Sequence, residues 1–524
     1  MRIRHNTFRG IRPRLDPELL EGNEAQTAEN VMLDKGTLRP WDNELLNDSL
    51  ENNSLVRTVF LYEGAYWLEF TADVDLVLAP LSGDTTGRFY YSGDGIPKKS
   101  NLTEATTGSG AMPINFYPLA LPSPKPVLTG TPGAGGTGDA RNILYVWTVV
   151  SSWGEESVPS PASAIIEAKN GQTVALAGMT LVWQAATAYV AGDFVVSSSD
   201  ETYIYKCVTA GTSGALEPIW GETVDEDTED NGCVWRCYEN NISYKRIYRY
   251  NSGDEFGEYL YVDQMDAEDT TYSDETEDTD LGEVLPSTTW DPPPDELTGI
   301  TYIGNGMMAG FSGKDLYVSE PWRFWAFPTD YIIAFPYTIV AIKEADETTV
   351  VMTEQGAFVV TGKDPASLDS TPLSDPKACV SKRGVVSFNV TQGETDLAQV
   401  IYPTPEGLCM VHGSTEALIT KNQLSKKDWQ SYYPTTMHGH IHKNKYFGFY
   451  SYGTTEGCVV FDFITGDLTT LDLYTSAVYV DHQTDTMYFV KGTSEVLLLE
   501  NGVTYPARAN MLLLEDGLSA LLLE

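Results

Sequence analysis

The sequence predicts an all-β protein whose largest part is a β-propeller. The first observation is the stretch 311–360, where short runs rich in β-branched and aromatic residues are separated by Gly, Pro, Asp and Glu. The separators recur about every ten residues, which is typical of antiparallel strands in sandwiches, barrels and propellers. The second observation is that this spacing continues toward the end of the chain, with hairpin-like repeats at 406–414 and 456–467. No signature of a known propeller repeat accompanies it, so the propeller prediction rests on strand spacing.

Charge is the strongest compositional signal. The 524 residues include 33 Lys and Arg against 74 Asp and Glu, which gives a formal net charge of −41. Such a surface binds duplex DNA poorly, because phosphate contacts need cations. Two explanations stay open: solubility alone, or a surface past which a polyanion moves without sticking. The sequence has no apolar run of about eighteen residues and no secretory leader, so we expect no membrane insertion.

Residues 1–54 are predicted to form an N-terminal arm. Positive charge is concentrated at its start, at Arg2, Arg4, Arg9, Arg12 and Arg14. A basic arm on an acidic body suits docking to an acidic neighbour, so these arginines are the predicted docking residues. A disordered basic tail is the alternative.

Residues 55–125 and 289–500 are predicted to form the propeller together. Alternating apolar runs between 59 and 91 indicate strands, so the propeller would take strands from both halves of the chain. Residues 101–140, rich in Gly, Thr and Pro, are expected to be a linker. Residues 501–524 repeat Leu-Leu-Leu-Glu and are expected to form exposed strands that pair with a neighbouring protein.

A fibronectin-like β-sandwich is predicted from 126–182 and 240–288, and the stretch 183–239 between them is predicted to be an inserted module. The pattern from Trp183 through Gly192-Asp193 to Cys207 resembles small chitinase-type carbohydrate-binding modules. That resemblance implies aromatic rings that stack on sugars, and the candidates are Trp183, Tyr189, Trp220 and Trp235. The alternative is that these four rings fill the core of a small module.

Residues 222–283 are densely acidic. A calcium loop starting at Asp227 fails on spacing, because its twelfth position is Tyr238 and Glu239 lies one residue too far. Solvated loops are the favoured interpretation, and in an assembled ring such loops could line a channel. The channel candidates are Asp225, Asp227, Glu229, Asp263, Asp266, Glu268 and Asp269.

The sequence holds few signs of chemistry. His438, His440 and His442 alternate, so an extended strand would place three imidazoles on one face, but no nearby acid or cysteine completes a metal site. The six cysteines show no metal-binding pattern, and we expect buried, reduced thiols. Nucleophile elbows, phosphate-binding loops and dinucleotide fingerprints are missing from the sequence. We expect no enzymatic activity, no metal and no cofactor.

Several motifs together resemble the tail nozzle proteins of short-tailed bacteriophages, also called tail tubular protein B. They are Phe8-x-Gly-Ile, Asn23-x-Ala-Gln-x-Ala-x-Asn30, Trp153-Gly-Glu-Glu-Ser-x-Pro-Ser160, Phe311-Ser-Gly-x-x-Leu-Tyr-x-Ser-Glu-Pro321 and Cys379-Val-Ser-Lys-Arg383. The resemblance extends loosely over most of the chain, and its motifs are structural rather than catalytic.

This resemblance implies a structural virion protein of the phage tail, assembled in the host cytoplasm. It implies a homo-hexameric ring below a tail adaptor protein, with tail fibres nearby and phage DNA passing through without binding. The five arginines would then dock to the adaptor, and the acidic loops would line the bore. Two other classes stay open: a receptor- or glycan-binding tail protein that uses residues 183–237, and a polysaccharide depolymerase.

Overall fold

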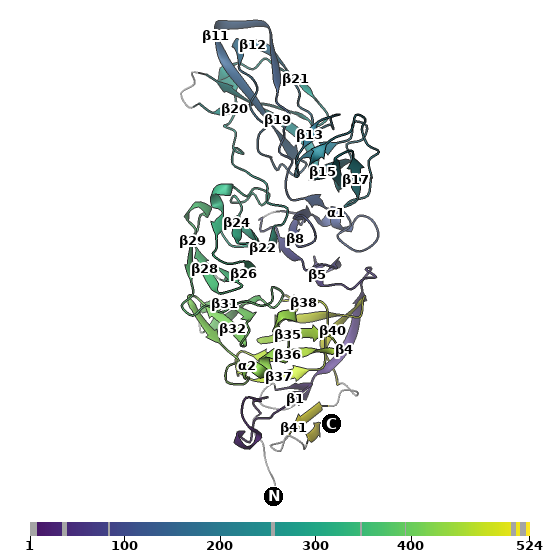
Figure 1. The fold of residues 1–524 in the computed structure, drawn as a ribbon, viewed down its shortest axis with the longest axis vertical. Coiled ribbons are helices and arrows are strands. Elements are labelled where there is room, and N and C mark those ends of the chain that lie inside the picture. Colours follow the sequence, from purple (N-terminus) through teal and green to yellow (C-terminus); the bar gives the residue numbers. More distant parts are fainter. Residues whose placement is uncertain are drawn as a thin grey trace.

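The computed structural model describes residues 8–33, 39–81, 84–252, 257–345, 348–392, 395–504, 510–513 and 520–523. Strands dominate this part of the chain, and its α-helices are the short α1 (Leu102–Thr106) and α2 (Lys426–Gln430). The all-β class predicted from the sequence is confirmed. Figure 1 shows an elongated molecule with a long sheet at one end, small sheets below it, and β1 and β41 at the other end.

Four of the small sheets come from consecutive segments, and each contains four antiparallel strands in chain order. The first two sheets contain β22 (Thr298–Tyr302), β23 (Met308–Ser312), β24 (Asp315–Val318) and β25 (Ile333–Ala334), then β26 (Ile339–Ala345), β27 (Thr348–Thr353), β28 (Ala357–Thr361) and β29 (Asp369–Pro372). The next two contain β30 (Val386–Gln392), β31 (Thr395–Pro403), β32 (Leu408–His412) and β33 (Thr415–Leu418), then β34 (His438–His442), β35 (Lys445–Tyr452), β36 (Thr455–Asp462) and β37 (Leu468–Leu471).

Strands from the first fifty residues complete two sheets of the second half. The sheet of β38 (Val478–Asp481), β39 (Thr486–Lys491) and β40 (Glu495–Thr504) takes β4 (Asp42–Ser49) as its fourth strand. The sheet of β34–β37 is extended by β1 (Ala28–Glu29), β41 (Asn510–Leu513) and β42 (Ala520–Leu523). A two-stranded ladder of β2 (Val31–Met32) and β3 (Arg39–Pro40) lies between β1 and β4 in the chain.

The described part of the predicted arm packs onto the β34–β37 sheet. Phe8, Ile11 and Ala28 are buried in one core with Leu468 of β37. Gly10 has a φ of 78°, and a Cβ there would lie 2.3 Å from the carbonyl oxygen of Leu468. Only glycine lets the two backbones approach this closely. Residues 8–33 are therefore part of the folded body.

Two more sheets lie between residues 58 and 118. The hairpin of β5 (Thr58–Tyr62) and β6 (Tyr66–Phe70) is followed by the four-stranded sheet of β7 (Asp75–Leu78), β8 (Phe89–Ser92), β9 (Lys98–Ser100) and β10 (Tyr117–Pro118). Their burial patterns alternate only in part, because several of their strands are covered on both faces.

These seven small sheets follow one another in a closed order, with an apolar core between each neighbouring pair; we call them the closed array. The core around Tyr90 and Ile300 joins β7–β10 to β22–β25, and four further cores join each sheet to the next as far as β38–β40. The core around Val59 and Val490 joins β38–β40 to the β5–β6 hairpin. The core around Tyr62 and Phe89 then returns to β7–β10, so the series closes on itself.

Above the array in Figure 1 lies one five-stranded sheet in the order β20-β19-β11-β12-β21. We call it the upper sheet. Its strands are β11 (Thr129–Ser151), β12 (Ile166–Ala177), β19 (Ile242–Asn251), β20 (Tyr259–Asp266) and β21 (Thr271–Asp274). The first part of β11 pairs with β12 and the second part with β19. The fibronectin-like topology stays a prediction.

The glycine-rich stretch expected to be a linker enters β11 at Thr129, so the linker expectation was wrong for 129–140. Register shifts interrupt the pairing in this part of β11, where Gly135, Gly136 and Gly138 have positive φ. A Cβ at Gly136 would lie 2.7 Å from the Cβ of Lys169 on β12. Glycine therefore allows a bulged strand to lie close against its partner.

Three serines spaced three residues apart attach the segment after β11 to β11 itself. Ser157, Ser160 and Ser163 each donate the backbone N–H to a β11 carbonyl. Each Oγ also accepts the N–H of that same β11 residue, at 3.0–3.1 Å. Each serine thus forms hydrogen bonds with both the backbone N–H and the backbone C=O of one β11 residue. This pairing explains the two serines, Ser157 and Ser160, of the Trp153–Ser160 motif.

The inserted module, 183–239, forms two small sheets between β12 and β19. One pairs β13 (Ala188–Tyr189) with β16 (Gly211–Thr212), and the other has the order β14 (Phe194–Val196), β15 (Tyr203–Thr209), β18 (Cys233–Glu239) and β17 (Asp227–Asp230). Among the described residues, short 3₁₀ helices lie at 17–19, 278–280, 329–331, 365–367 and 434–436.

Candidate functional site

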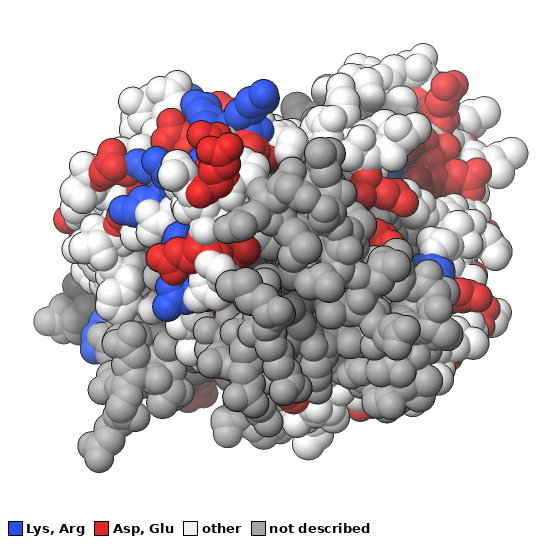
Figure 2. Space-filling view, turned by 90° about the horizontal axis from the view of Figure 1, so that it is seen from below, with Lys and Arg blue, Asp and Glu red and all other residues white. Residues whose placement is uncertain are grey.

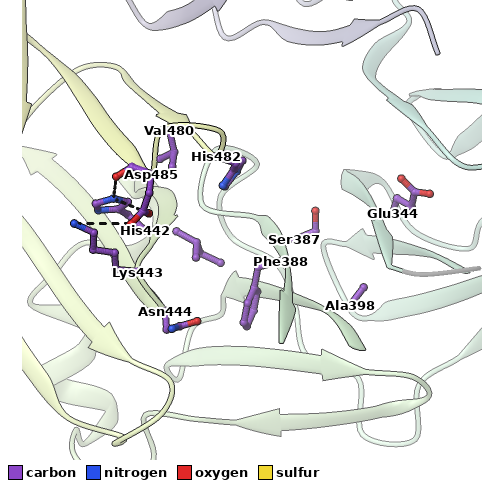
Figure 3. Close-up of a pocket in the computed structure, with 11 residues that line it drawn as sticks. Glu344, Ser387, Phe388, Ala398, His442, Lys443, Asn444, Val480, His482 and Asp485 are labelled. Atoms are coloured by element: carbon purple, nitrogen blue, oxygen red, sulfur yellow. Dashed lines mark hydrogen bonds and ion pairs between the residues drawn. The ribbon is translucent and has the colours of Figure 1, made fainter. Parts of the chain in front are cut away.

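A cavity of about 830 Å³ lies at the ends of the first strands of four neighbouring sheets of the closed array; we call it the axial cavity. Figure 3 shows its wall, which contains Glu344, Ser387 and Val480 beside a polar group around His442. His442 Nε2 lies 3.0 Å from the carbonyl oxygen and 3.3 Å from Oδ1 of Asp485. Contacts with Asp485 of the same chain therefore occupy the Nε2 atom of His442. A smaller cavity of about 250 Å³, lined by Lys343 and His440, shares part of this wall.

Two cations of the Cys379–Arg383 motif lie across the middle of the array. Lys382 Nζ is 2.6 Å from Asp75 Oδ2 and 3.2 Å from Asp73 Oδ2. Arg383 donates to the carbonyl oxygens of Arg57 and Ser476, at 2.6 and 2.7 Å. Burial lowers the pKa of Lys382, but the two carboxylates outweigh burial and leave this pKa above its usual value.

Three of these contacts join residues that are more than 300 positions apart in the chain, and the contact of Arg383 with Ser476 joins residues 93 positions apart. Arg57 lies just before β5 and Asp75 begins β7, whereas Ser476 lies two residues before β38. The carbonyl of Arg383 also accepts the backbone N–H of Gly439 on β34. Lys382 and Arg383 therefore bridge several sheets of the array near its centre.

The three alternating histidines do not converge on one point. His438 Nδ1 lies 3.1 Å from His440 Nε2, and His438 Nε2 lies 2.7 Å from the carbonyl oxygen of Thr475. Burial and the nearby Arg383 lower the pKa of both rings, that of His440 to about 3, so both are neutral near pH 7. Among the described residues, no group of three or more His, Cys, Asp or Glu is arranged to hold a metal.

The predicted docking arginines lie in different surroundings. Arg2 and Arg4 are outside the described residues. Arg9 is exposed, whereas Arg12 Nη1 lies 2.6 Å from Oε1 of the buried Glu24 and Arg14 donates to the carbonyl of Lys421. Arg14 therefore helps to hold residues 8–33 on the body, Arg12 pairs within that segment, and Arg9 offers the freer side chain of the three.

The four aromatic candidates of the inserted module gather in one core. Trp183 and Trp235 are 7% and 0% exposed, and both indole N–H groups donate to the buried Asp230, at 2.8 and 3.1 Å. Trp220 and Tyr189, both half-buried, pack on neighbouring rings of this core. Trp183 and Trp235 therefore have no open ring face for a sugar, because the module is too small to build its core without them.

All six cysteines are buried and free, as the sequence indicated for the thiols. Cys207 does not face Cys237 across the β15–β18 ladder, because Cys207 is opposite Trp235 and Cys237 is opposite Tyr205. Burial raises the pKa of both thiols to about 12, which keeps them protonated at neutral pH.

The acidic channel candidates form two groups rather than one surface. In the first, Asp225 lies 3.2 Å from Lys98 Nζ, Asp227 makes two contacts with Arg236 at 2.7 and 3.0 Å, and Glu229 is exposed. Most of 227–239 and 259–274 is strand, so the expectation of solvated loops was wrong for these parts. In β17, exposed carboxylates alternate with buried side chains, as expected of a strand with one buried face. The number of acidic residues in 222–283 does not reveal this alternation.

The second acidic group surrounds a hollow of about 610 Å³ between the module and the upper sheet. Its wall includes Asp266 and Glu268 with Asp200 and Glu201. The other two candidates lie apart: Asp263 accepts the Tyr272 hydroxyl at 2.8 Å, and the carbonyl of Asp269 accepts a hydrogen bond from the buried Lys245.

A buried ion pair that the sequence does not reveal joins the upper sheet to the array. Lys99 of β9 and Glu155, just after β11, are 0% and 1% exposed and form a direct contact. Next to them, Glu156 accepts hydrogen bonds from Arg246 and Tyr248, both at 2.7 Å. Two acidic residues in a row normally indicate surface, and no local pattern identifies a partner 56 residues away.

No family model and no curated protein matches the chain. Among solved structures, the extracellular domain of BT4673 from B. thetaiotaomicron is 9% identical, with 90% of this chain and 84% of that chain covered and a TM-score of 0.29. PorZ of Porphyromonas gingivalis is 12% identical, with 63% and 40% covered and a TM-score of 0.26, so this chain spans less than half of PorZ. The AfRom2 CNH domain is 10% identical, with 61% and 98% covered and a TM-score of 0.27.

Scores this low carry no argument about the fold or function of this chain. Within the described residues, no helix is long and apolar enough to span a membrane.

Proposed function

We propose that this chain is the structural subunit of the nozzle ring of a phage tail, and that the ring is a homo-hexamer whose acidic bore conducts DNA. The arrangement of charge carries this proposal. The net charge is −41, and many Lys and Arg side chains of the described residues contact carboxylates of the same chain, among them Lys98, Lys99, Arg236, Arg246 and Lys382. Cations engaged in this way are poor partners for phosphate, and the surplus carboxylates repel it.

One face of the molecule illustrates this arrangement. Figure 2 shows basic side chains lying beside acidic ones on one side of the face, whereas acidic side chains predominate on the other side. A duplex that passes such a surface keeps its counterions, because counterion release requires cations from the protein. Screening limits the repulsion to roughly 8 Å at physiological ionic strength, so the carboxylates nearest the bore decide it.

We also propose that the closed array is a seven-bladed β-propeller. In support, each four-stranded sheet runs in chain order and contacts the next through its first strand, and β4 from the N-terminal half completes the last sheet. A ring closed by an early strand resists opening, because separation would expose apolar cores on both sides of a blade. Such a body suits a protein whose role is mechanical.

The residues that carry the nozzle resemblance lie at joints between distant segments. Gly10 lies against Leu468, Glu155 pairs with Lys99, and Arg383 bridges to Arg57 and Ser476. These motifs therefore hold the shape of the subunit, as a structural role requires. Arg9, together with Arg2 and Arg4 outside the described residues, stays the proposed contact with the tail adaptor, and the fibres are proposed neighbours.

The bore in this proposal lies between copies and not along the centre of the array. Lys382 and Arg383 bridge that centre, and the axial cavity of about 830 Å³ has the size of a small-molecule site. The carboxylates around the hollow of Asp266 and Glu268 are the bore candidates we favour, because they lie on an open surface with other acids.

Assembly mass and duplex binding test the proposal together. We expect native mass spectrometry of the full chain to give six times 57.7 kDa, and electron microscopy to show a ring. We expect no duplex binding at physiological salt, and measurable binding after Asp266 and Glu268 are both changed to Lys. A monomer at every concentration would contradict the ring, and tight duplex binding by the unchanged chain would contradict the acidic bore.

A receptor- or glycan-binding role is the second candidate. The sequence suggested this role because aromatic rings could stack on sugars. Trp183 and Trp235 are buried and offer no ring face for such stacking. A cavity of about 260 Å³ at the edge of the inserted module, lined by Tyr189, Asp193 and Phe194, favours it instead.

A further inference from the structure

We infer that the closed array binds one small oxyanion that carries its own proton, such as hydrogen phosphate, in the cavity of about 250 Å³ beside the axial cavity. We call it the side cavity. Ser387, Ile441, Val480 and His482 line both cavities, and three of them, Ser387, Val480 and His482, are labelled in Figure 3. The inference goes beyond the nozzle role and does not depend on it. Small-molecule sites usually enclose roughly 300–1,000 Å³, so a cavity just below that range suits an ion of a few atoms.

The wall of the side cavity is positively charged. Lys343 lines it together with the imidazoles of His440 and His482, and no Asp or Glu is among the described residues of this wall. Such a wall is unexpected in a chain with 74 Asp and Glu against 33 Lys and Arg. Unlike Lys98 and Lys382, Lys343 forms no ion pair with a described residue. Its ammonium group is therefore available to an anion.

Hydrogen bonds fix the tautomers of two neighbouring histidines. The carbonyl oxygen of Thr475 only accepts, so His438 Nε2, which lies 2.7 Å away, carries a proton. In the neutral ring His438 Nδ1 is then an acceptor, so the proton shared over 3.1 Å belongs to His440 Nε2. His440 Nδ1 is left as an unprotonated acceptor, and it has no hydrogen-bond partner among the described residues.

The side cavity therefore asks its ligand both to accept and to donate. Burial and the nearby charges of Arg383 and Lys343 lower the pKa of His440 to about 3, so the ring stays neutral near pH 7. An anion beside Lys343 accepts from the ammonium group, and it must donate to His440 Nδ1 to satisfy that atom. Hydrogen phosphate does both, because it keeps an O–H beside its charged oxygens at neutral pH. The Ser387 hydroxyl, on the same wall, offers a further hydrogen bond.

Other anions meet this requirement less well. Sulfate and carboxylates carry no O–H at neutral pH, so they would face the lone pair of His440 Nδ1 or force a proton onto that ring. A phosphate diester also has no O–H, which excludes the backbone of DNA, and a phosphate monoester loses its last proton near a pKa of about 6. Bicarbonate has one O–H and shares the chemistry of hydrogen phosphate.

The first test is calorimetry of the full chain in a phosphate-free buffer near neutral pH, with inorganic phosphate, bicarbonate, sulfate, acetate and dimethyl phosphate as probes. We expect phosphate to bind with a Kd below about 10 mM and each of the last three probes to bind at least about tenfold more weakly. Tighter binding of phosphate than of bicarbonate would identify phosphate as the ligand, and the reverse order would identify bicarbonate. Either order supports a proton-carrying oxyanion.

Two variants of one residue locate the binding. Lys343→Gln removes the charge at similar size and should weaken binding at least about tenfold, because a charge-assisted hydrogen bond is lost. Lys343→Arg keeps the charge and should bind within about threefold of the unchanged chain. Lys427→Gln, at an exposed position of α2 outside the cavity, is the matched control and should bind as the unchanged chain does.

The inference is overturned if neither phosphate nor bicarbonate binds, or if Lys343→Gln binds like the Lys427→Gln control. Equally tight binding of sulfate or dimethyl phosphate would also overturn it, since the ligand would then need no proton. Thermal melts check that the variants fold. The comparison of sulfate with phosphate uses the unchanged chain, so it decides even if a variant does not fold.

Discussion

The closed array and the upper sheet are held together in different ways. Each sheet of the array shares an apolar core with both neighbours, as Val400 and Val350 illustrate in the core between the β26–β29 and β30–β33 sheets. The upper sheet instead meets the array through a buried ion pair, Lys99 with Glu155, and through the Trp325 indole N–H, which donates to the carbonyl of Glu156 at 2.9 Å. Apolar cores tolerate small adjustments in packing, whereas a buried ion pair requires one geometry and strongly penalises the loss of either partner. The apolar cores therefore favour a closed array, whereas the buried ion pair fixes the angle between the upper sheet and the array.

The largest effect is expected at the junction. Lys99→Met would leave the Glu155 carboxylate buried without a cation, and we expect the free energy of unfolding to fall by about 3–5 kcal/mol in denaturant titrations. The double variant Lys99→Met with Glu155→Met is the control, and it should recover most of the loss because no charge stays buried. Equal instability of the single and double variants would contradict this account of the junction.

An apolar truncation in the array should cost somewhat less. Leu408 is 0% exposed in the core between the β30–β33 and β34–β37 sheets, and Leu408→Ala should cost about 2–5 kcal/mol, since a cavity replaces the side chain. Chemical denaturation measures the cost, and Leu216→Ala, at an 85% exposed position, should change stability by less than about 0.5 kcal/mol. A neutral Leu408→Ala variant would show that the array is loosely packed.

A smaller effect should appear as pH falls. The pKa of His440 is lowered to about 3 in the folded protein, whereas an unfolded histidine has a pKa near 6.5. Between these values the unfolded state binds the extra proton, so this histidine's contribution to stability decreases as pH falls below about 6.5. The slope is at most about 1.4 kcal/mol per pH unit. Denaturant titrations at several pH values should show a shallower slope for His440→Gln than for the unchanged chain.

The smallest effects should separate the arginines of the N-terminal region. Arg12→Ser would remove the partner of Glu24, whose side chain is 2% exposed, and should cost about 1 kcal/mol. Arg9→Ser, at an exposed position, should change stability by less than about 0.5 kcal/mol but weaken the proposed attachment to a tail adaptor. Thermal melts and co-sedimentation with the adaptor measure the two quantities. A large loss of stability for Arg9→Ser would place this residue in the internal packing.

Strand spacing predicted the parts of the fold that repeat locally. The runs around Val350 and Val400 become strands because alternation and turn residues are encoded within a few positions of each other. The role of the glycines in β11 could not be predicted this way. Gly136 is required by the closeness of Lys169, a residue on the next strand, and composition alone indicates a linker.

The candidate sites were harder to predict than the strands. An aromatic pattern cannot distinguish a ring that binds sugar from a ring that fills a core, and for Trp235 the partner that decides is Asp230, five residues earlier in the chain but on the neighbouring strand. The cavity of about 260 Å³ at the edge of the inserted module depends on the connector 123–126 lying against Tyr189, which only the tertiary structure shows. In the sequence, Asp193 stood out only as part of the Gly192-Asp193 pair in the pattern that resembles carbohydrate-binding modules.

The pairing of β4 with β40 also has a consequence for biosynthesis. The ribosome makes Asp42–Ser49 long before Glu495–Thr504, and roughly 450 residues separate the two strands. At about 5–20 residues per second, β4 waits roughly 20–90 s for its partner. During that time one edge of the last sheet cannot form, and the nascent chain exposes a strand that could pair with the wrong neighbour. Premature termination anywhere before residue 495 would thus leave this sheet without its closing pair, so truncated chains should stay incompletely folded and be degraded.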